Sequence, residues 1–213
     1  MKYKHIIWDF NGTILDDTDA AIKSENTLLN RRNMPLIKNR EHYHSIFRFP
    51  IKEYYRSLGH DVSPESYDML AREWVKEYLE NSLSSPLCPG VKEALELFAT
   101  MKLPQTVISM TESGMLQKQI KSLGISQYFT DVVGLDNILA ESKLIIAEQW
   151  AAKVKPESPL FIGDTTHDLE TARIIGADCA LVANGHQSRE TLLASGGCGI
   201  YTSLYALVDA LKA

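Results

Sequence analysis

The sequence predicts an α/β fold in which a Rossmann-like, doubly wound parallel sheet carries an inserted all-helical domain. Short apolar runs alternate with helical patterns along most of the chain, and this alternation favours a parallel sheet. The runs lack a clear period of two, which is typical of strands covered by helices on both faces. Residues 15–86 break the alternation, because they carry helical patterns but no convincing strand.

The individual elements follow from local patterns. Strands are expected at residues 5–9, 105–110, 160–164 and 179–183, with weaker candidates at 128–134 and 200–202. Apolar residues between 91 and 101 have the i, i+3, i+4, i+7 spacing of an amphipathic helix. A second helix should end before Gly124, since glycine is favoured just past a helix C-terminus. A third helix begins near Ser142, and a last one covers 204–211.

The length of 213 residues suits one α/β domain with an insert better than two full-size domains. We expect residues 1–14 and 87–213 to form the α/β domain, and we call residues 15–86 the helical insert. The segment 84–90 is punctuated by proline and glycine, as expected where the chain returns from the helical insert.

Composition narrows the range of partners. The formal charge is −5 and no basic run compensates for it, which argues against nucleic acid and anionic membrane surfaces. No stretch of about 18 apolar residues predicts a membrane-spanning helix. The three cysteines are scattered, which is typical of a reducing compartment, so we expect a cytoplasmic protein. A monomer and a homodimer both fit this composition.

Polar residues follow three of the predicted strands, at the carboxyl edge where an open parallel sheet binds its ligands. They are Asp9 and Asn11, Ser109 and Thr111, and Asp164 and Asp168. Asp9 and Asp164 would repel each other unless a cation lay between them, and carboxylates suit Mg²⁺. Alternatively, either aspartate could be a simple turn or N-cap residue. Lys143 opens the helix that precedes the strand at 160–164, which places it near the same edge.

This ordered set resembles the four motifs of the haloacid dehalogenase (HAD) superfamily. Asp9-Phe10-Asn11-Gly12-Thr13 is similar to the first motif, and Ser109 and Lys143 to the second and third. Gly163-Asp164 through Asp168 is similar to the fourth. The match spans residues 3 to about 185 and looks most like the phosphoglycolate-phosphatase-like branch. The helical insert lies where that branch carries its small cap domain.

The resemblance implies a Mg²⁺-dependent phosphatase for a small phosphorylated metabolite, with Asp9 as the nucleophile that forms an aspartyl-phosphate. The metal would be held by the Asp9 and Asp164 carboxylates and by the backbone carbonyl of Asn11. Asp168 would hold a metal-bound water or orient Lys143. Lys143 and Ser109, with Thr111 as the next candidate, would bind the phosphoryl group. Lys153 and Lys155 are alternatives to Lys143, but they lie at the far end of their helix.

Asn11 departs from the pattern of the family, whose phosphatases usually have an aspartate there that acts as a general acid and base. An amide cannot deliver a proton, and losing such help typically costs about 10²- to 10⁴-fold in rate. A slow phosphatase, or one restricted to good leaving groups such as acyl or aryl phosphates, is one interpretation. A phosphate-binding or regulatory protein with little catalysis is another. A metal-independent dehalogenase is the third, although Asp164 and Asp168 argue against it.

The cap should select the substrate, because the core motifs mainly contact the phosphate. Arg48 lies between Phe47 and Phe49, and we expect it to bind an anionic or planar substrate group, with His44 and Arg32 behind it. Alternatively, the two phenylalanines pack inside the cap and Arg48 points to solvent. His167 is expected as an exposed loop histidine; alternatively, it lines the mouth of the site.

Overall fold

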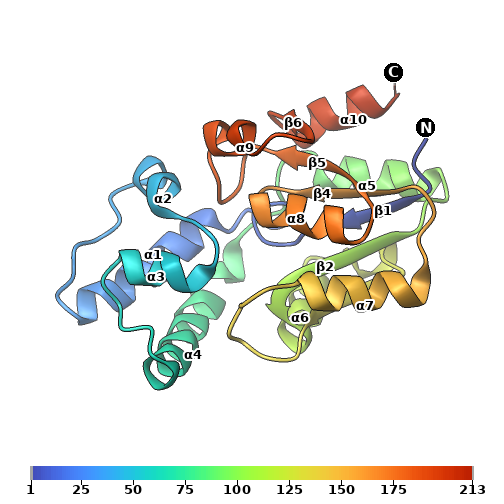
Figure 1. The fold of residues 1–213 in the computed structure, drawn as a ribbon. Coiled ribbons are helices and arrows are strands. Elements are labelled where there is room, and N and C mark those ends of the chain that lie inside the picture. The colour runs from blue at the N-terminus through green and yellow to red at the C-terminus, as the bar shows by residue number, and fades with distance from the viewer. Residues whose placement is uncertain (1, 213) are drawn as a thin grey trace.

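The computed structural model describes residues 2–212 and has a six-stranded, wholly parallel sheet (Figure 1). The strand order is β3-β2-β1-β4-β5-β6, so the chain winds outward from β1 in both directions. The predicted fold class is therefore confirmed. The strands are β1 (His5–Trp8), β2 (Gln105–Glu112), β3 (Asp131–Leu135), β4 (Pro159–Gly163), β5 (Asp178–Val182) and β6 (Gly199–Tyr201).

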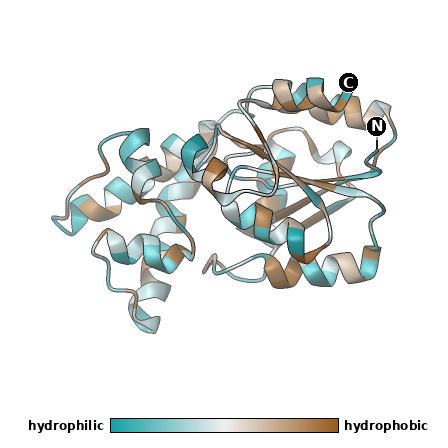
Figure 2. Cartoon of the chain, turned by 45° about the horizontal axis from the view of Figure 1, so that its top comes forward, coloured by the Kyte–Doolittle hydropathy of each residue, from teal (hydrophilic) through white to brown (hydrophobic). Residues whose placement is uncertain are grey.

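Helices cover both faces of this sheet, as the uninterrupted apolar strands require. In β1, Ile6 and Trp8 face one hydrophobic cluster with α5 (Val91–Thr100), α6 (Ser113–Ser122) and α10 (Leu204–Lys212). Ile7 points to the opposite face, where it packs with α7 (Leu144–Val154) and α8 (Thr166–Ile174). Brown, hydrophobic strands lie between the helices in Figure 2. The short α9 (Arg189–Ser195) packs near the outer strands.

The helical insert contains α1 (Thr18–Arg31), α2 (Arg40–Ile46), α3 (Ile51–Ser57), α4 (Pro64–Asn81) and the 3₁₀ turn η1 (Ser82–Ser84). These helices lie beside the sheet and have a core of their own that includes Leu28, Leu29, Tyr55 and Leu70 (Figure 1). α1 and α4 pack against each other. None of the helices within residues 2–212 is long and apolar enough to cross a lipid bilayer.

The two segments that join the helical insert to the sheet run side by side. Leu15 forms an antiparallel bridge with Leu87. The backbone N–H of Asp16 donates to the carbonyl of Pro86 at 2.9 Å, and that of Cys88 donates to the carbonyl of Ile14 at 2.8 Å. We call these paired segments the crossing.

Two strands differ from the sequence prediction. The strand predicted at 128–134 begins only at Asp131, because Tyr128 ends the 3₁₀ turn η2 (Ser126–Tyr128) and packs its ring on the core from there. β2 extends beyond Met110 to Glu112, past an irregularity in its pairing with β3. Glu112 ends the strand because its carboxylate accepts from the backbone N–H groups of Gly114 and Met115 and so caps α6.

Candidate active site

The carboxyl ends of β1 and β4 bring three aspartates together. Asp9 follows β1 and Asp164 follows β4, and these two strands are neighbours in the sheet. Asp168 lies in the first turn of α8. All three side chains are buried, and one carboxylate oxygen from each lies within 4.8 Å of the others. The sequence analysis expected this clustering of the first and fourth motifs.

Lys143 is the cation of this cluster. It precedes α7, is only 2% exposed, and donates from Nζ to Asp9 and, at 2.5 Å, to Oδ1 of Asp168. Burial lowers the pKa of Lys143, but the Asp168 and Asp9 carboxylates outweigh that effect and raise the pKa above its usual value. Lys153 and Lys155 are exposed, at the far end of α7.

Asp168 is held by the chain through both of its oxygens. Oδ2 accepts from the backbone N–H groups of Asp164 and Thr165 at 3.0 and 2.9 Å, and from Oγ1 of Thr165 at 2.8 Å. These contacts form a capping box at the start of α8. Oδ1 is the partner of Lys143. Of the two roles expected for Asp168, its contacts favour the orientation of Lys143.

Two glycines allow the backbone to close around Asp164. Its Oδ1 accepts from Thr13 Oγ1 at 2.8 Å and its Oδ2 accepts from the backbone N–H of His186 at 2.6 Å. A Cβ on Gly12 would lie 2.3 Å from Oδ2 of Asp164, and one on Gly185 would lie 2.1 Å from it. Gly12 also has a φ of +74°, which side chains disfavour.

The charges of the cluster fit a divalent cation. Three buried carboxylates face a single ammonium group, so the cluster carries excess negative charge. Burial and the Asp168 charge raise the pKa of Asp9 well above its usual range. Burial likewise raises the pKa of Asp164 to about 6. A hard cation between carboxylates that lie this close together stabilises their charged forms, and the Asp9 and Asp164 oxygens are ligands that Mg²⁺ prefers.

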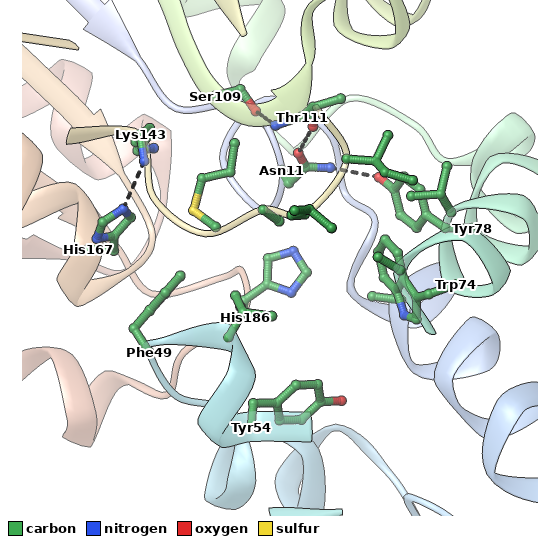
Figure 3. Close-up of a pocket in the computed structure, with 18 of the residues that line it drawn as sticks. Asn11, Phe49, Tyr54, Trp74, Tyr78, Ser109, Thr111, Lys143, His167 and His186 are labelled. Carbon is green, nitrogen blue, oxygen red and sulfur yellow. Dashed lines mark hydrogen bonds between the residues drawn. The ribbon is translucent and has the colours of Figure 1, made fainter. Parts of the chain in front are cut away.

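Asn11 is fixed by three neighbours, two of which the sequence analysis did not identify (Figure 3). Its Oδ1 accepts from Thr111 Oγ1 at 2.8 Å, and its Nδ2 donates to Asp17 Oδ2 at 2.8 Å and to Tyr78 Oη at 2.7 Å. Tyr78 also donates to Asp17 Oδ2 at 2.6 Å. The amide is therefore held in one orientation by residues from β2, from the crossing and from α4.

His186, which follows β5, contacts two residues of the helical insert. Its Nε2 lies 3.2 Å from Asp17 Oδ1, and its Nδ1 lies 2.8 Å from Tyr43 Oη. Burial lowers the pKa of His186, but Asp17 outweighs that effect and raises the pKa to about 9. Sequence reasoning missed His186, although its loop follows β5 at the same sheet edge as Asp9. An examination of the residues that follow β5, as was done for the other strands, would have identified His186.

A cavity of about 170 Å³ lies between this cluster and the helical insert. Ser109 and Thr111 line it, as expected of phosphate-binding candidates, and the backbone N–H of Thr111 donates to Ser109 Oγ at 3.0 Å. Tyr54 and Tyr55 are buried in the core of the helical insert and also reach the cavity.

Arg48 does not line the cavity, so its expected contact with substrate is not supported. It is exposed, and its Nε donates to the carbonyl of Ile46 at 3.0 Å, while Phe47 and Phe49 on either side turn their rings to the cavity. The two residues expected behind it are also engaged elsewhere. Arg32 pairs with Glu73 at 2.8 Å, and His44 contacts the carbonyl of Gly185 at 3.0 Å.

The expectation that His167 is an exposed loop residue is wrong. It is 4% exposed, lies in the first turn of α8 and lines the cavity. Its Nε2 accepts from the backbone N–H of Lys143 at 3.3 Å, and its ring stacks on Phe49 with 4.9 Å between centroids. Phe49 comes from the helical insert, so the contact that buries His167 depends on how the insert packs.

Comparisons with known proteins agree with this geometry. A family model described as haloacid dehalogenase-like hydrolase matches residues 6–182 and so spans the three aspartates and Lys143. The chain belongs to this family. The resemblance of the four motifs to the HAD superfamily is thus confirmed.

Two relatives of this HAD-family chain are both described as phosphoglycolate phosphatases. The chain is 24% identical over 194 residues to a phosphoglycolate phosphatase of Synechococcus elongatus, and the match covers 89% of this chain and 88% of the relative. It is 21% identical to another from Chromobacterium violaceum, covering 98% and 99%.

Solved structures show the same fold. A HAD-like family hydrolase from Streptococcus pneumoniae superposes with a TM-score of 0.82 at 17% identity, covering 99% of both chains. A predicted phosphoglycolate phosphatase from Haemophilus somnus superposes with a TM-score of 0.78 at 18% identity, and the match covers 99% of both chains.

Proposed function

We propose that the chain is a Mg²⁺-dependent phosphatase that hydrolyses a small phosphorylated metabolite through an aspartyl-phosphate on Asp9. The observation that carries this proposal is the placement of Asp9, which is bound by Lys143, lies beside Asp164 and lines the cavity. Membership of the HAD-like hydrolases and relatives described as phosphoglycolate phosphatases support it.

The reaction has two displacements at phosphorus. A carboxylate oxygen of Asp9 attacks, a new P–O bond forms, and the bond from phosphorus to the leaving oxygen breaks with its electron pair. Water then attacks the aspartyl-phosphate, which returns the carboxylate and releases inorganic phosphate. Lys143 favours the ionised form of Asp9 and would stabilise charge on the transferring group, and Ser109, which lines the cavity, would bind a phosphoryl oxygen.

Asp9, Asp164 and the backbone carbonyl of Asn11 would hold the Mg²⁺. When bound, the ion neutralises phosphoryl charge and aligns the phosphate for attack. Asp168 would orient Lys143 and cap α8, because Lys143 binds its Oδ1 and the backbone at the start of α8 binds its Oδ2. We also propose that residues 15–86 act as the cap over residues 1–14 and 87–213, since cavity-lining side chains come from both parts.

The amide at position 11 restricts the leaving group. Asn11 cannot protonate a departing alkoxide, and its Nδ2 hydrogens are directed at Asp17 and Tyr78. Substrates whose leaving oxygen departs as a stable anion need no such proton. We therefore propose slow turnover of alkyl phosphates and faster turnover of acyl or aryl phosphates.

Hydrolysis of p-nitrophenyl phosphate with Mg²⁺, and again with excess EDTA, tests the proposal. Activity that requires the metal supports it. Tight phosphate binding without turnover would instead indicate a phosphate-binding or regulatory protein. Turnover of a 2-haloacid in the presence of EDTA would indicate a dehalogenase.

A further inference from the structure

We infer that the organic part of the substrate is an uncharged aromatic ring, so that the preferred substrates are aryl phosphates without a second anionic group. This inference rests on the proposed phosphatase function and names the substrate class of the same site. It follows from the chemistry of the cavity wall, the cations available there, the size of the cavity and the contacts of Asn11.

The wall contributed by the helical insert is aromatic and apolar. Phe49 and Tyr54 come from the segment around the start of α3, and Trp74 and Tyr78 come from α4, so that aromatic side chains enter the cavity from two sides (Figure 3). The rings of Trp74 and Tyr78 stack with 4.7 Å between centroids and 10° between planes. A rigid aromatic wall of this kind favours a planar apolar group by stacking and by burial of its surface.

Among the described residues, none that lines the cavity offers an unpaired cation for a second negative charge. Of residues 2–212, Lys143 is the only lysine or arginine that lines the cavity, and it is bound by Asp9 and Asp168. Both ring nitrogens of His186 are also engaged, by Asp17 and Tyr43.

Carboxylates on the wall add to this effect. Asp17 and Glu112 line the cavity as well, and both already have partners: Asp17 Oδ1 lies 3.2 Å from Nε2 of His186, and the Glu112 carboxylate accepts from the backbone N–H groups of Gly114 and Met115. Neither carboxylate can donate a hydrogen bond to an anionic substrate group. A substrate carboxylate would therefore lose its hydration without gaining an unpaired cationic partner among the described lining residues. This feature disfavours substrates such as phosphoglycolate, the compound named in the descriptions of the relatives.

The cavity limits the organic group to about one ring, because the same cavity must also hold the phosphoryl group beside Asp9. Its volume is about 170 Å³, and an apolar cavity of about 150 Å³ is large enough to bind benzene.

The same substrate class follows independently from Asn11. When the P–O bond to an aryl oxygen breaks, the aryloxide keeps the electron pair without help from an acid and later takes a proton from water.

Three substrates separate ring recognition from leaving-group reactivity. Phenyl phosphate and 4-carboxyphenyl phosphate release phenols of similar basicity, but only the second carries an extra charge. Acetyl phosphate has a reactive leaving group and no ring. With Mg²⁺ present, we expect kcat/KM for phenyl phosphate to exceed that for 4-carboxyphenyl phosphate by at least about 10-fold, the effect of one poorly solvated charge.

The outcomes distinguish this inference from the proposed function. Equal kcat/KM values for the two aryl esters, or a preference for the carboxylated ester, would overturn the inference and leave the phosphatase in place. Hydrolysis of acetyl phosphate but of neither aryl ester would likewise overturn the inference and leave the phosphatase in place. Failure to hydrolyse any of the three would overturn both.

Variants of Trp74 test the wall directly. Trp74→Ala should raise the KM for phenyl phosphate by about 5-fold or more and lower the preference for phenyl over acetyl phosphate. Trp74→Phe, which keeps a ring, should retain most of that preference. Met69→Ala is the matched control, because Met69 is 58% exposed on the same helix and does not line the cavity. Equal KM changes for both substrates in Trp74→Ala would count against the inference.

Discussion

Asn11 donates a hydrogen bond from its side-chain amide to the Asp17 carboxylate, with 2.8 Å between Nδ2 and Oδ2. Asp17 is 1% exposed, so this contact is shielded from water. A second carboxylate at position 11 would lie against the first and repel it. The amide at position 11 and the carboxylate at position 17 are therefore physically linked, and a substitution at either site has to be judged with the other.

We expect Asn11→Asp alone to destabilise the fold by about 1–3 kcal/mol, because it replaces a buried hydrogen bond by two carboxyl groups that must share a proton. Adding Asp17→Asn should recover part of that stability, since it removes the repulsion between the two carboxyl groups but also removes the charge that pairs with His186. Chemical denaturation of the single and double variants measures the difference. Asp17→Asn alone completes a double-mutant cycle, and additive changes in the free energy of unfolding would show that positions 11 and 17 do not interact.

The same exchange should change catalysis. The carboxyl group that the double variant carries at position 11 can protonate a leaving alkoxide, so kcat for an alkyl phosphate should rise by up to about 10²-fold, with little gain for an aryl phosphate. Asp17→Asn alone has no acid at position 11 and serves as the control. The ratio of the alkyl gain to the aryl gain is the decisive measurement, and a ratio near one would mean that Asn11 is not a lost acid.

Asp9→Asn should abolish phosphatase activity while the fold persists, because it removes only the attacking oxygen's charge. Lys143 keeps its contact with Asp168 in this variant. Steady-state kinetics with an aryl phosphate, with circular dichroism to confirm folding, provides the measurement. Full activity in a folded variant would exclude Asp9 as the nucleophile.

Lys143→Ala should lower kcat/KM by at least about 10-fold, since a charge-assisted contact to the transferring group is worth more than about 1.4 kcal/mol. It should also cost about 3–5 kcal/mol of stability, because Asp9 and Asp168 remain buried without their cation. Lys153→Ala, an exposed lysine on the same helix, is the matched control and should change neither quantity. A greater loss of activity in the control would mean that Lys143 is not the catalytic lysine.

Mg²⁺ should stabilise the folded chain measurably. At about 100 times its dissociation constant the ion would contribute about 2.7 kcal/mol, which for a chain of this length raises Tm by about 5–10 °C. Asp164→Asn removes the negative charge of a proposed metal ligand and should reduce the shift. Scanning calorimetry with NaCl at matched ionic strength provides the comparison. An unchanged Mg²⁺ response in the variant would exclude Asp164 from the metal site.

Sequence reasoning located the residues that the sheet itself brings together. Asp9 and Asp164 could be predicted because neighbouring parallel strands end at one edge, and Lys143 because its helix begins there. Contacts that depend on the packing of the helical insert could not be read from the sequence. Tyr78 reaches Asn11 only because α4 packs against α1, and Arg48 turns outward because its flanking phenylalanines line the apolar cavity. Periodicity within a helix carries no information about such placements.

The crossing has a consequence for how the chain tolerates change in length. Leu15 and Leu87 are joined by a backbone bridge, so the chain leaves and re-enters the α/β domain at almost the same point. An insertion whose ends are adjacent places no demand on the spacing of the strands around it. Segments of very different size, down to a short turn, could therefore occupy this position without altering the register between β1 and its neighbours. The segment inserted at the crossing can therefore be replaced by another without changing the α/β domain.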